Sequence, residues 1–164
     1  MTSDHEPNTS IRLARSGDAE RLAALSGILQ RQHAAQRPDI FKPLDRASAI
    51  GFFRDQLARA DVVILIGEAA QTAVGYLMAE AVTQEETPFT RALTALHIQH
   101  LVIDEDFRSQ GVGQALLARA GQEAKLRECD VLQLACWSFN QTAQAFFTAN
   151  GFEPHQVRMT RRAR

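Results

Sequence analysis

The chain has 164 residues, 45% of them hydrophobic, and this length suits one domain with a sizeable core better than two domains. A formal net charge of −1 gives no broad basic surface for nucleic acid or anionic lipid, and no apolar run approaches the roughly 20 residues that span a membrane. The polar residues 1–10 resemble neither a secretory signal nor a transit peptide. We therefore expect one domain over residues 1–164, with a flexible N-terminus at 1–9, in a cytoplasmic protein without a nucleic-acid or membrane partner.

The two cysteines indicate neither a disulfide framework nor a metal site. Cys129 and Cys136 lack the Cys-x-x-Cys spacing of zinc sites, and no histidine pair lies nearby in the sequence. We expect reduced thiols that are packed within the fold, with Cys136 on a strand, and no metal cofactor.

The first half of the chain predicts a strand, two helices and a β-hairpin. Ser16 or Asp18 can cap the first helix, and two prolines in 37–43 require a loop after it. A polar turn around Gln71 separates two apolar runs, which predicts antiparallel strands. In chain order these elements are a strand at 11–14, a helix from 16–18 to about 35, a helix at 47–60, and strands at 62–68 and 73–82.

The second half predicts alternating strands and helices after an exposed loop at 85–89. The run 95–103 is apolar on both faces, which is typical of a central strand. The elements are strands at 95–103, 131–137 and 152–160 and helices at 112–127 and 142–149. The complete order, β-α-α-β-β-β-α-β-α-β, predicts a mixed α/β sheet with helices on both faces.

A glycine-bearing turn, Arg108-Ser109-Gln110-Gly111-Val112-Gly113, lies between the predicted central strand and the helix that follows it. The first N–H groups of a helix lack intrahelical partners and carry partial positive charge, so this turn can bind a phosphate chain that approaches the glycines closely. A P-loop is disfavoured because Gln114 and Ala115 stand where lysine and serine or threonine are needed. A dinucleotide-binding turn is disfavoured because Leu116 replaces its third glycine.

A second distinctive stretch, further along the chain, is Asn140-Gln141-Thr142-Ala143-Gln144-Ala145-Phe146-Phe147-Thr148-Ala149-Asn150-Gly151-Phe152. It resembles the Asn-x-x-Ala-x-x-Phe-Tyr-x-x-x-Gly-Phe signature of the GNAT superfamily of N-acetyltransferases. The turn at 108–113 resembles the Arg/Gln-x-x-Gly-x-Gly/Ala loop with which that family binds the pyrophosphate of acetyl-CoA. Both signatures occur in the family's order and spacing, so the resemblance is specific over 94–152.

The resemblance implies a GNAT-like α/β fold, with a mixed, mostly antiparallel central sheet of about 6–7 strands flanked by about four helices. It also implies acetyl-CoA as cosubstrate, with no metal. The strand before the loop would pair its backbone with the pantetheine arm, as extended ligands pair with a sheet edge. The residues that the resemblance assigns to acetyl-CoA are Leu101, Val102, Ile103, Arg108, Ser109, Gln110, Gly111, Val112, Gly113, Asn140 and Phe147.

Two of these residues, Asn140 and Phe147, have a possible role other than the one that the family resemblance implies. Asn140 matches the family asparagine that contacts CoA, but asparagine is also a preferred N-cap for the following helix, and it can serve as both. Phe147 stands where the family often has a tyrosine that protonates the departing CoA sulfur. Phenylalanine has no proton to donate, so water, Ser138 or another group must do so, or the step is not needed.

A histidine on the central strand is the candidate base. Attack by an alkyl amine requires a neutral nitrogen, and imidazole gains and loses a proton near neutral pH. Counting back from Arg108, His97 falls where some family members place the Glu or His that acts as base. We therefore take His97 as the candidate catalytic residue.

The other histidines are expected to be structural or exposed. Strict alternation along a strand would place His100 on the face opposite His97, together with Ile98 and Val102, where it would be a core histidine. His33 and His155 are expected on the surface.

The expected function is acetylation of a primary amine, on a small molecule, a protein N-terminus or a lysine, by direct transfer within a ternary complex. The alternative, motivated by Phe147, is a CoA-binding sensor or interaction module with little or no activity. The acceptor is not defined by the sequence. Acidic residues near its site would favour a cationic amine, and the candidates are Asp39, Glu80, Glu85 and Glu86. A homodimer is a further expectation from the family.

Overall fold

The structure is a computed structural model that describes residues 9–163. In chain order its elements are β1 (Thr9–Leu13), η1 (Ser16–Asp18), α1 (Ala19–Gln36), α2 (Arg46–Leu57), β2 (Val62–Ala69), β3 (Thr72–Gln84), β4 (Leu93–Ile103), η2 (Glu105–Phe107), α3 (Val112–Leu126), β5 (Val131–Leu134) and α4 (Gln141–Ala149). Of the N-terminus expected to be flexible, residues 1–8 lie outside the described residues, and Thr9 belongs to β1.

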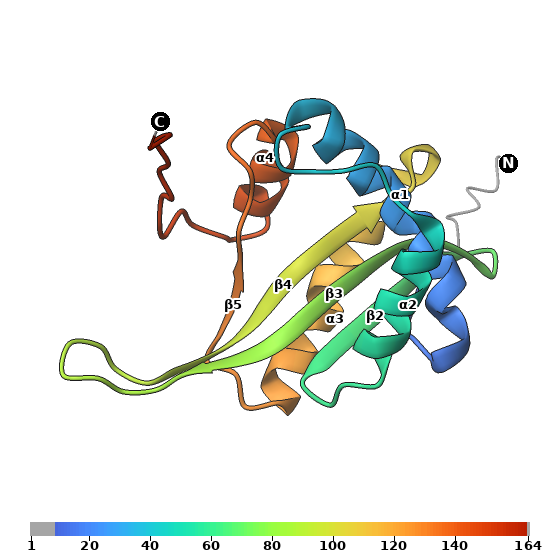
Figure 1. Cartoon of the computed structure of the whole chain (residues 1–164). Coiled ribbons are helices and arrows are strands. Elements are labelled where there is room, and N and C mark those ends of the chain that lie inside the picture. The colour runs from blue at the N-terminus through green and yellow to red at the C-terminus, as the bar shows by residue number, and fades with distance from the viewer. Residues whose placement is uncertain (1–8, 164) are drawn as a thin grey trace, which may run out of the picture.

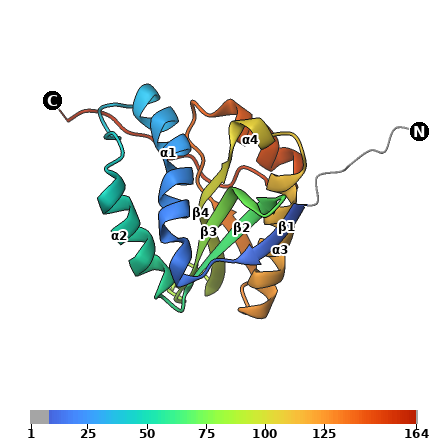
Figure 2. The same cartoon turned by 90° about the vertical axis from the view of Figure 1, so that its right-hand side faces the viewer.

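The strands form one sheet in the order β1-β2-β3-β4-β5. All neighbouring strands are antiparallel except β4 and β5, which run parallel. The helices α1 and α2 cover one face of the sheet, α3 covers the other, and α4 lies beyond the end of β5 (Figure 1, Figure 2). This arrangement confirms the predicted mixed α/β sheet with helices on both faces.

Two apolar clusters join these layers. Successive side chains of a strand point to opposite faces, so β2 and β3 contribute to both clusters. The cluster on the α3 side includes Leu65, Leu77, Leu96, Leu116 and Ala120, and the cluster on the α1–α2 side includes Leu22, Phe53, Ile66, Tyr76 and Met78. Full burial of a large apolar side chain stabilises a fold by about 1.5–3 kcal/mol, so these contacts fix the helices on the sheet.

The sheet has five strands, fewer than the 6–7 expected from the family resemblance. The predicted last strand, 152–160, is wrong, because these residues form no regular secondary structure. Val157 and Met159 in this tail are 80% and 88% exposed. A strand needs a neighbour that satisfies its backbone groups, and the tail runs away from β5 (Figure 1). The strand predicted at 131–137 also ends early, at Leu134, where the chain leaves the sheet.

Asp18 is the N-cap residue of α1, but its side chain does not make the predicted capping hydrogen bond. The side chain instead ties the N-terminal elements together. Its buried carboxylate accepts hydrogen bonds from the guanidinium of Arg12 in β1, at 2.7 and 2.9 Å, and from the backbone N–H of Arg15 at 2.8 Å. Arg12 also donates to Glu68 of β2 at 2.8 Å. The Arg12 guanidinium holds the pKa of Asp18 well below its usual range, so this carboxylate stays ionised.

Both cysteines are free thiols and half-buried. Cys136 lies after the end of β5 and not on a strand, with its sulfur 3.8 Å from the carbonyl oxygen of Asn140. Burial raises the pKa of both thiols. Among residues 9–163, no helix is long and apolar enough to cross a membrane.

Candidate active site

The backbone edge of β4 that faces β5 is only partly paired. Strand β3 pairs with β4 from residue 93 to residue 103 except at Gln99, whereas β5 pairs only with residues 95–98. Beyond that point the two strands diverge (Figure 1), and no backbone hydrogen bond among the described residues joins 99–103 to the segment after β5. This stretch is therefore open to pairing with an extended ligand. It includes the residues expected to pair with pantetheine, Leu101, Val102 and Ile103.

A β-bulge at Gln99 changes which side chains share a face of β4. Neighbouring residues of β3 lie opposite His100 and Ile98, so Gln99 between them has no register partner. Ile98 packs on the α3 side, whereas Val102 packs on the α1–α2 side. The prediction that His100 shares a face with both of them was wrong, because the extra residue shifts the alternation by one.

The bulge brings His97 and His100 to the same face of the sheet, the one that α1 and α2 cover. His97 lies between Leu96 and Ile98, which both pack on the α3 side, and its register partner is Glu80. Alternation therefore directs His97 to the opposite side. Within residues 9–163 its half-buried imidazole makes no hydrogen bond or ion pair, which leaves it available to a ligand.

His100 is held by the hydroxyl group of Tyr76, a contact that the sequence did not indicate. The Tyr76 oxygen lies 2.9 Å from His100 Nδ1, and the rings of Phe52 and Phe53 are centred 6.4 Å from the imidazole. Burial raises the pKa of Tyr76 and lowers the pKa of His100 to about 4. We assign the Tyr76 hydroxyl as donor to Nδ1, which leaves the imidazole proton on Nε2. His100 is thus a neutral, structurally bonded histidine, as predicted.

The predicted phosphate-binding turn leads into α3 through a backbone conformation that favours glycine. Gly111 has φ +81°, in the left-handed region, and a Cβ there would meet no atom within 4 Å. The first helical hydrogen bond runs from the N–H of Ala115 to the Gly111 carbonyl at 3.0 Å. The N–H groups of Val112, Gly113 and Gln114 therefore lack intrahelical partners. These donors and the helix dipole form a site that fits an anion.

The side chains of the turn place one cation beside this helix start. Arg108 is exposed, and its guanidinium lies 3.4 Å from the Ile103 carbonyl oxygen and 3.7 Å from the Glu105 carboxylate. Ser109 is exposed and has φ +62°, while Gln110 donates to a backbone carbonyl of the preceding turn at 3.0 Å. Arg108 is thus positioned between the open edge of β4 and the free N–H groups of α3.

Two other residues assigned to acetyl-CoA have packing contacts. A Cβ on Gly113 would lie 3.0 Å from a ring carbon of Phe146, so the missing side chain lets α4 approach α3. The ring of Phe147 lies 5.4 Å from that of Phe146 and 5.5 Å from that of Phe152, and it packs against the α3-side cluster. Both residues therefore support the position of α4 beside the turn.

Asn140 caps α4. Its Oδ1 accepts a hydrogen bond from the N–H of Ala143 at 3.1 Å, which confirms the capping alternative. Because this oxygen is already bonded, the side-chain amide nitrogen is the group with which Asn140 can also contact a ligand.

The structure also joins aromatic side chains that the sequence left unassigned. His33 was expected on the surface, but it is half-buried, and burial lowers its pKa. His155 is exposed, as predicted. We call the following group the aromatic cluster: His33 of α1, Phe41 of the α1–α2 loop, and Trp137 and Phe139 of the β5–α4 connection. Trp137 and Phe139 directly precede the signature that begins at Asn140, a position that could have drawn attention to them.

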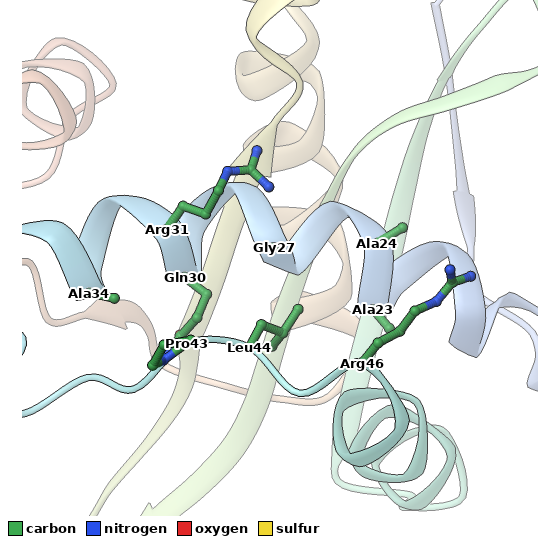
Figure 3. Close-up of a pocket in the computed structure, with 9 residues that line it drawn as sticks. All are labelled: Ala23, Ala24, Gly27, Gln30, Arg31, Ala34, Pro43, Leu44 and Arg46. Atoms are coloured by element: carbon green, nitrogen blue, oxygen red, sulfur yellow. The ribbon is translucent and has the colours of Figure 1, made fainter.

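A surface pocket lies elsewhere, between α1 and the segment that leads into α2 (Figure 3). Its lining consists of Ala23, Ala24, Gly27, Gln30, Arg31, Ala34, Pro43, Leu44 and Arg46. None of the residues assigned to acetyl-CoA lines it, and neither His97 nor His100 does. Small apolar side chains dominate the lining, so we place the chemistry at the β4 edge and not in this pocket.

Comparisons with known proteins show which family and which solved structures the chain resembles. The model of the acetyltransferase (GNAT) family matches residues 22–152. No curated protein matches the chain. The structural likenesses reported next are below 25% identity, so they bear on the fold alone.

Three solved structures illustrate the fold. A tetramutant of the BH1408 protein from Bacillus halodurans has a TM-score of 0.88 at 21% identity, covering 93% of this chain and 99% of that one. The aminoglycoside N-acetyltransferase AAC(6')-Iy in complex with CoA has a TM-score of 0.77 at 17% identity, covering 95% of each chain. A transcriptional regulator from Bacillus halodurans C-125 has a TM-score of 0.76 at 19% identity, covering 94% of this chain and 99% of that one. Since the family model spans most of the chain, including the turn and the capped helix α4, the chain belongs to the GNAT family of acetyltransferases.

Proposed function

We propose that this protein is an N-acetyltransferase that moves an acetyl group from acetyl-CoA directly to a primary amine of a small molecule or a protein. The observation that carries the proposal is the continuity between the unpaired edge of β4, at 99–103, and the free N–H groups at the start of α3. A pantetheine arm can pair with the first, and a pyrophosphate can bind the second. A protein of the same fold is described in complex with CoA.

The residues present fit acetyl-CoA without a metal. The open space beside Gly111 leaves room for a pyrophosphate at the main chain, and Arg108 adds a cation there. We assign the contact residues as Leu101, Val102, Ile103, Arg108, Ser109, Gln110, Gly111, Val112, Gly113, Asn140 and Phe147. When bound, acetyl-CoA supplies the activated acetyl thioester.

The chain's own contribution to chemistry is positioning and proton transfer. His97 lies on the α1–α2 side of β4, and its imidazole bonds none of residues 9–163, so it can accept the proton that an ammonium acceptor must lose. His100 serves differently, because its Nδ1 is occupied by Tyr76 and its Nε2 carries the proton. His100 therefore has no free ring nitrogen to accept a proton, so we do not assign it as the base.

The alternative function is a CoA-binding module that transfers no acetyl group. Phe147 has no proton to donate at the place where the family often has tyrosine, and one protein of this fold is described as a transcriptional regulator. Without a general acid, catalysis loses a factor of about 10²- to 10⁴-fold, and a reaction between a well-positioned thioester and amine can tolerate this loss.

The homodimer and the cytoplasmic location stay predictions.

Gly111→Val tests the site. Acetyl-CoA at one hundred times its dissociation constant should stabilise the wild-type protein by about 2.7 kcal/mol and raise its melting temperature by about 5–10 °C. The variant should lose this ligand-induced increase, because a branched side chain fills the open space and is strained at positive φ.

Gly121→Val is the matched control, since Gly121 lies within α3 and its Cβ would also meet no atom within 4 Å. It should keep the full ligand-induced increase. The melting temperatures of both variants without acetyl-CoA measure how far each substitution destabilises the fold by itself. The further increase with acetyl-CoA then measures binding alone. A folded Gly111→Val variant that binds acetyl-CoA like the wild type would contradict the assignment of the turn.

A further inference from the structure

The acidic residues that could attract a cationic acceptor are already engaged or distant. Asp39 forms a two-pronged pair with Arg37 at 2.8 Å, and Glu80 bonds Arg59 and, at 2.7 Å, Gln99. The two glutamates at 85–86 are exposed in the loop at the far end of the β3–β4 hairpin (Figure 1). These four carboxylates are therefore poorly placed to select a cationic acceptor.

The aromatic cluster connects two segments that lie about one hundred residues apart in sequence. The His33 ring is centred 4.7 Å from Phe41 and 5.8 Å from Phe139, Phe41 lies 5.2 Å from Trp137, and Trp137 stacks on Phe139 at 5.9 Å. Figure 2 shows the end of α1 beside the connection that leads into α4. The cluster is thus a continuous set of rings between the α1–α2 loop and the end of β5.

Its position relates it to the reaction centre. Trp137 follows Leu134 by three residues, and Leu134 pairs with Ile98 at the point where β5 leaves β4. On the other side, His33 lies in the last turn of α1, the helix that contacts β4 on the face to which His97 and His100 are directed. The aromatic cluster therefore borders the face of β4 on which His97 and His100 lie.

The chemistry of the cluster favours a flat aromatic group over a polycation. Trp137 is 36% exposed, so it is accessible to a ligand. Arg37 lies 5.8 Å from the centroid of its ring, and this guanidinium is already neutralised by Asp39. A cationic group placed on this ring would compete with Arg37, whereas the aromatic ring of an acceptor can stack or pack edge-on against the exposed surface while its amine lies away from Trp137.

We propose that the acceptor is an arylalkylamine, a primary amine joined to an aromatic ring by a short alkyl chain, whose ring packs against Trp137 in the aromatic cluster. The inference rests on the proposed function. Packing of the ring holds the amine at the face of β4 that bears His97. Ring contact contributes mainly to binding, so its loss raises KM more than it lowers kcat.

The experiment compares phenethylamine with 2-cyclohexylethylamine, which has similar size but no aromatic ring, and with spermidine. The wild-type protein should use phenethylamine roughly 3- to 10-fold more efficiently than the saturated amine, as expected for one aromatic pair. Trp137→Ala should abolish this preference through KM, and Trp137→Phe should retain most of it. Phe89→Ala, at a residue that is 95% exposed in the β3–β4 loop, should change nothing.

A binding measurement keeps this inference separate from the proposed function. Trp137 is the only tryptophan of the chain, so its emission reports directly on the cluster. Phenethylamine should change this emission in the wild-type protein with CoA present, and 2-cyclohexylethylamine should change it less. Unchanged emission, equal use of both amines, or a preference for spermidine would overturn the inference. Absence of any amine-dependent turnover together with a ring-specific emission change would count against the proposed function alone.

Discussion

Among single residues, His100 couples the stability of the fold to pH. Burial lowers its pKa from the ordinary value of 6.5 to about 4, and the neighbouring His33 acts in the same direction. Between these pH values the unfolded chain binds a proton that the folded chain does not, so the free energy of unfolding rises with pH. We expect the free energy of unfolding to be unaffected by His100 protonation above pH 6.5. As the pH drops to about 4, it should fall by up to about 3 kcal/mol.

His100→Asn tests the coupling, because asparagine offers Tyr76 a hydrogen-bond partner but does not titrate. Urea denaturation should show a smaller loss of stability over the same pH range for this variant than for the wild type. A residual dependence is expected from His33, whose pKa burial also lowers. Identical pH dependence in both proteins would contradict the neutral state assigned to His100.

His97 should affect turnover and not stability. Its imidazole makes no bond among residues 9–163, so His97→Ala should leave the urea midpoint nearly unchanged and reduce kcat/KM by about 10²-fold or more. His100→Ala should instead destabilise the protein by about 1–3 kcal/mol, because the buried Tyr76 hydroxyl loses its partner. Full turnover of the His97 variant across the neutral pH range would show that water or the acceptor itself suffices as base.

At the scale of elements, Gly75 fixes the position of the edge of β4 that we propose binds CoA. A Cβ on Gly75 of β3 would lie 2.7 Å from the Val102 carbonyl oxygen and 2.7 Å from a side-chain carbon of Ile103. Relief of this clash must move β4. Gly75→Ala should therefore destabilise the protein by about 1–3 kcal/mol and weaken acetyl-CoA binding, as measured by denaturation and calorimetry.

The control for this prediction is Gly51→Ala in α2, where a Cβ meets no atom within 4 Å. It should stabilise the protein by up to about 1 kcal/mol, because alanine is the better helix former. If the Gly75→Ala variant is destabilised but binds acetyl-CoA as tightly as the wild type, the position of β4 does not affect binding. That result would contradict the proposal that acetyl-CoA binds along the edge of β4.

The bulge marks the limit of sequence reasoning at this scale. The apolar run 95–103 predicted β4 correctly, but alternation could not locate an unpaired residue within it. Whether Gln99 is paired depends on the register with β3, which is set by tertiary contacts such as the bond from Gln99 to Glu80. The Tyr76–His100 contact was unpredictable for the same reason, since it joins two strands.

For the whole molecule, the sequence predicted the layers well and the last strand badly. Periodic apolar residues are enough to place α1, α2 and α3 on the two faces of the sheet, because each must bury its apolar stripe. The tail at 152–160 has strand-like composition, but a strand forms only beside a partner, and composition does not show whether one is within reach. Convergence of the aromatic cluster likewise depends on how two distant loops fold together.

Release of free CoA thiol from acetyl-CoA in the presence of primary amines, with the acetylated amine identified by mass, tests the central claim most directly. We predict thiol release that requires an amine, yields one acetylated product per thiol, and is lost in Gly111→Val but retained in Gly121→Val. Tight binding of acetyl-CoA without amine-dependent thiol release across a panel of aromatic, aliphatic and polycationic amines would contradict the transferase assignment and favour the CoA-binding module.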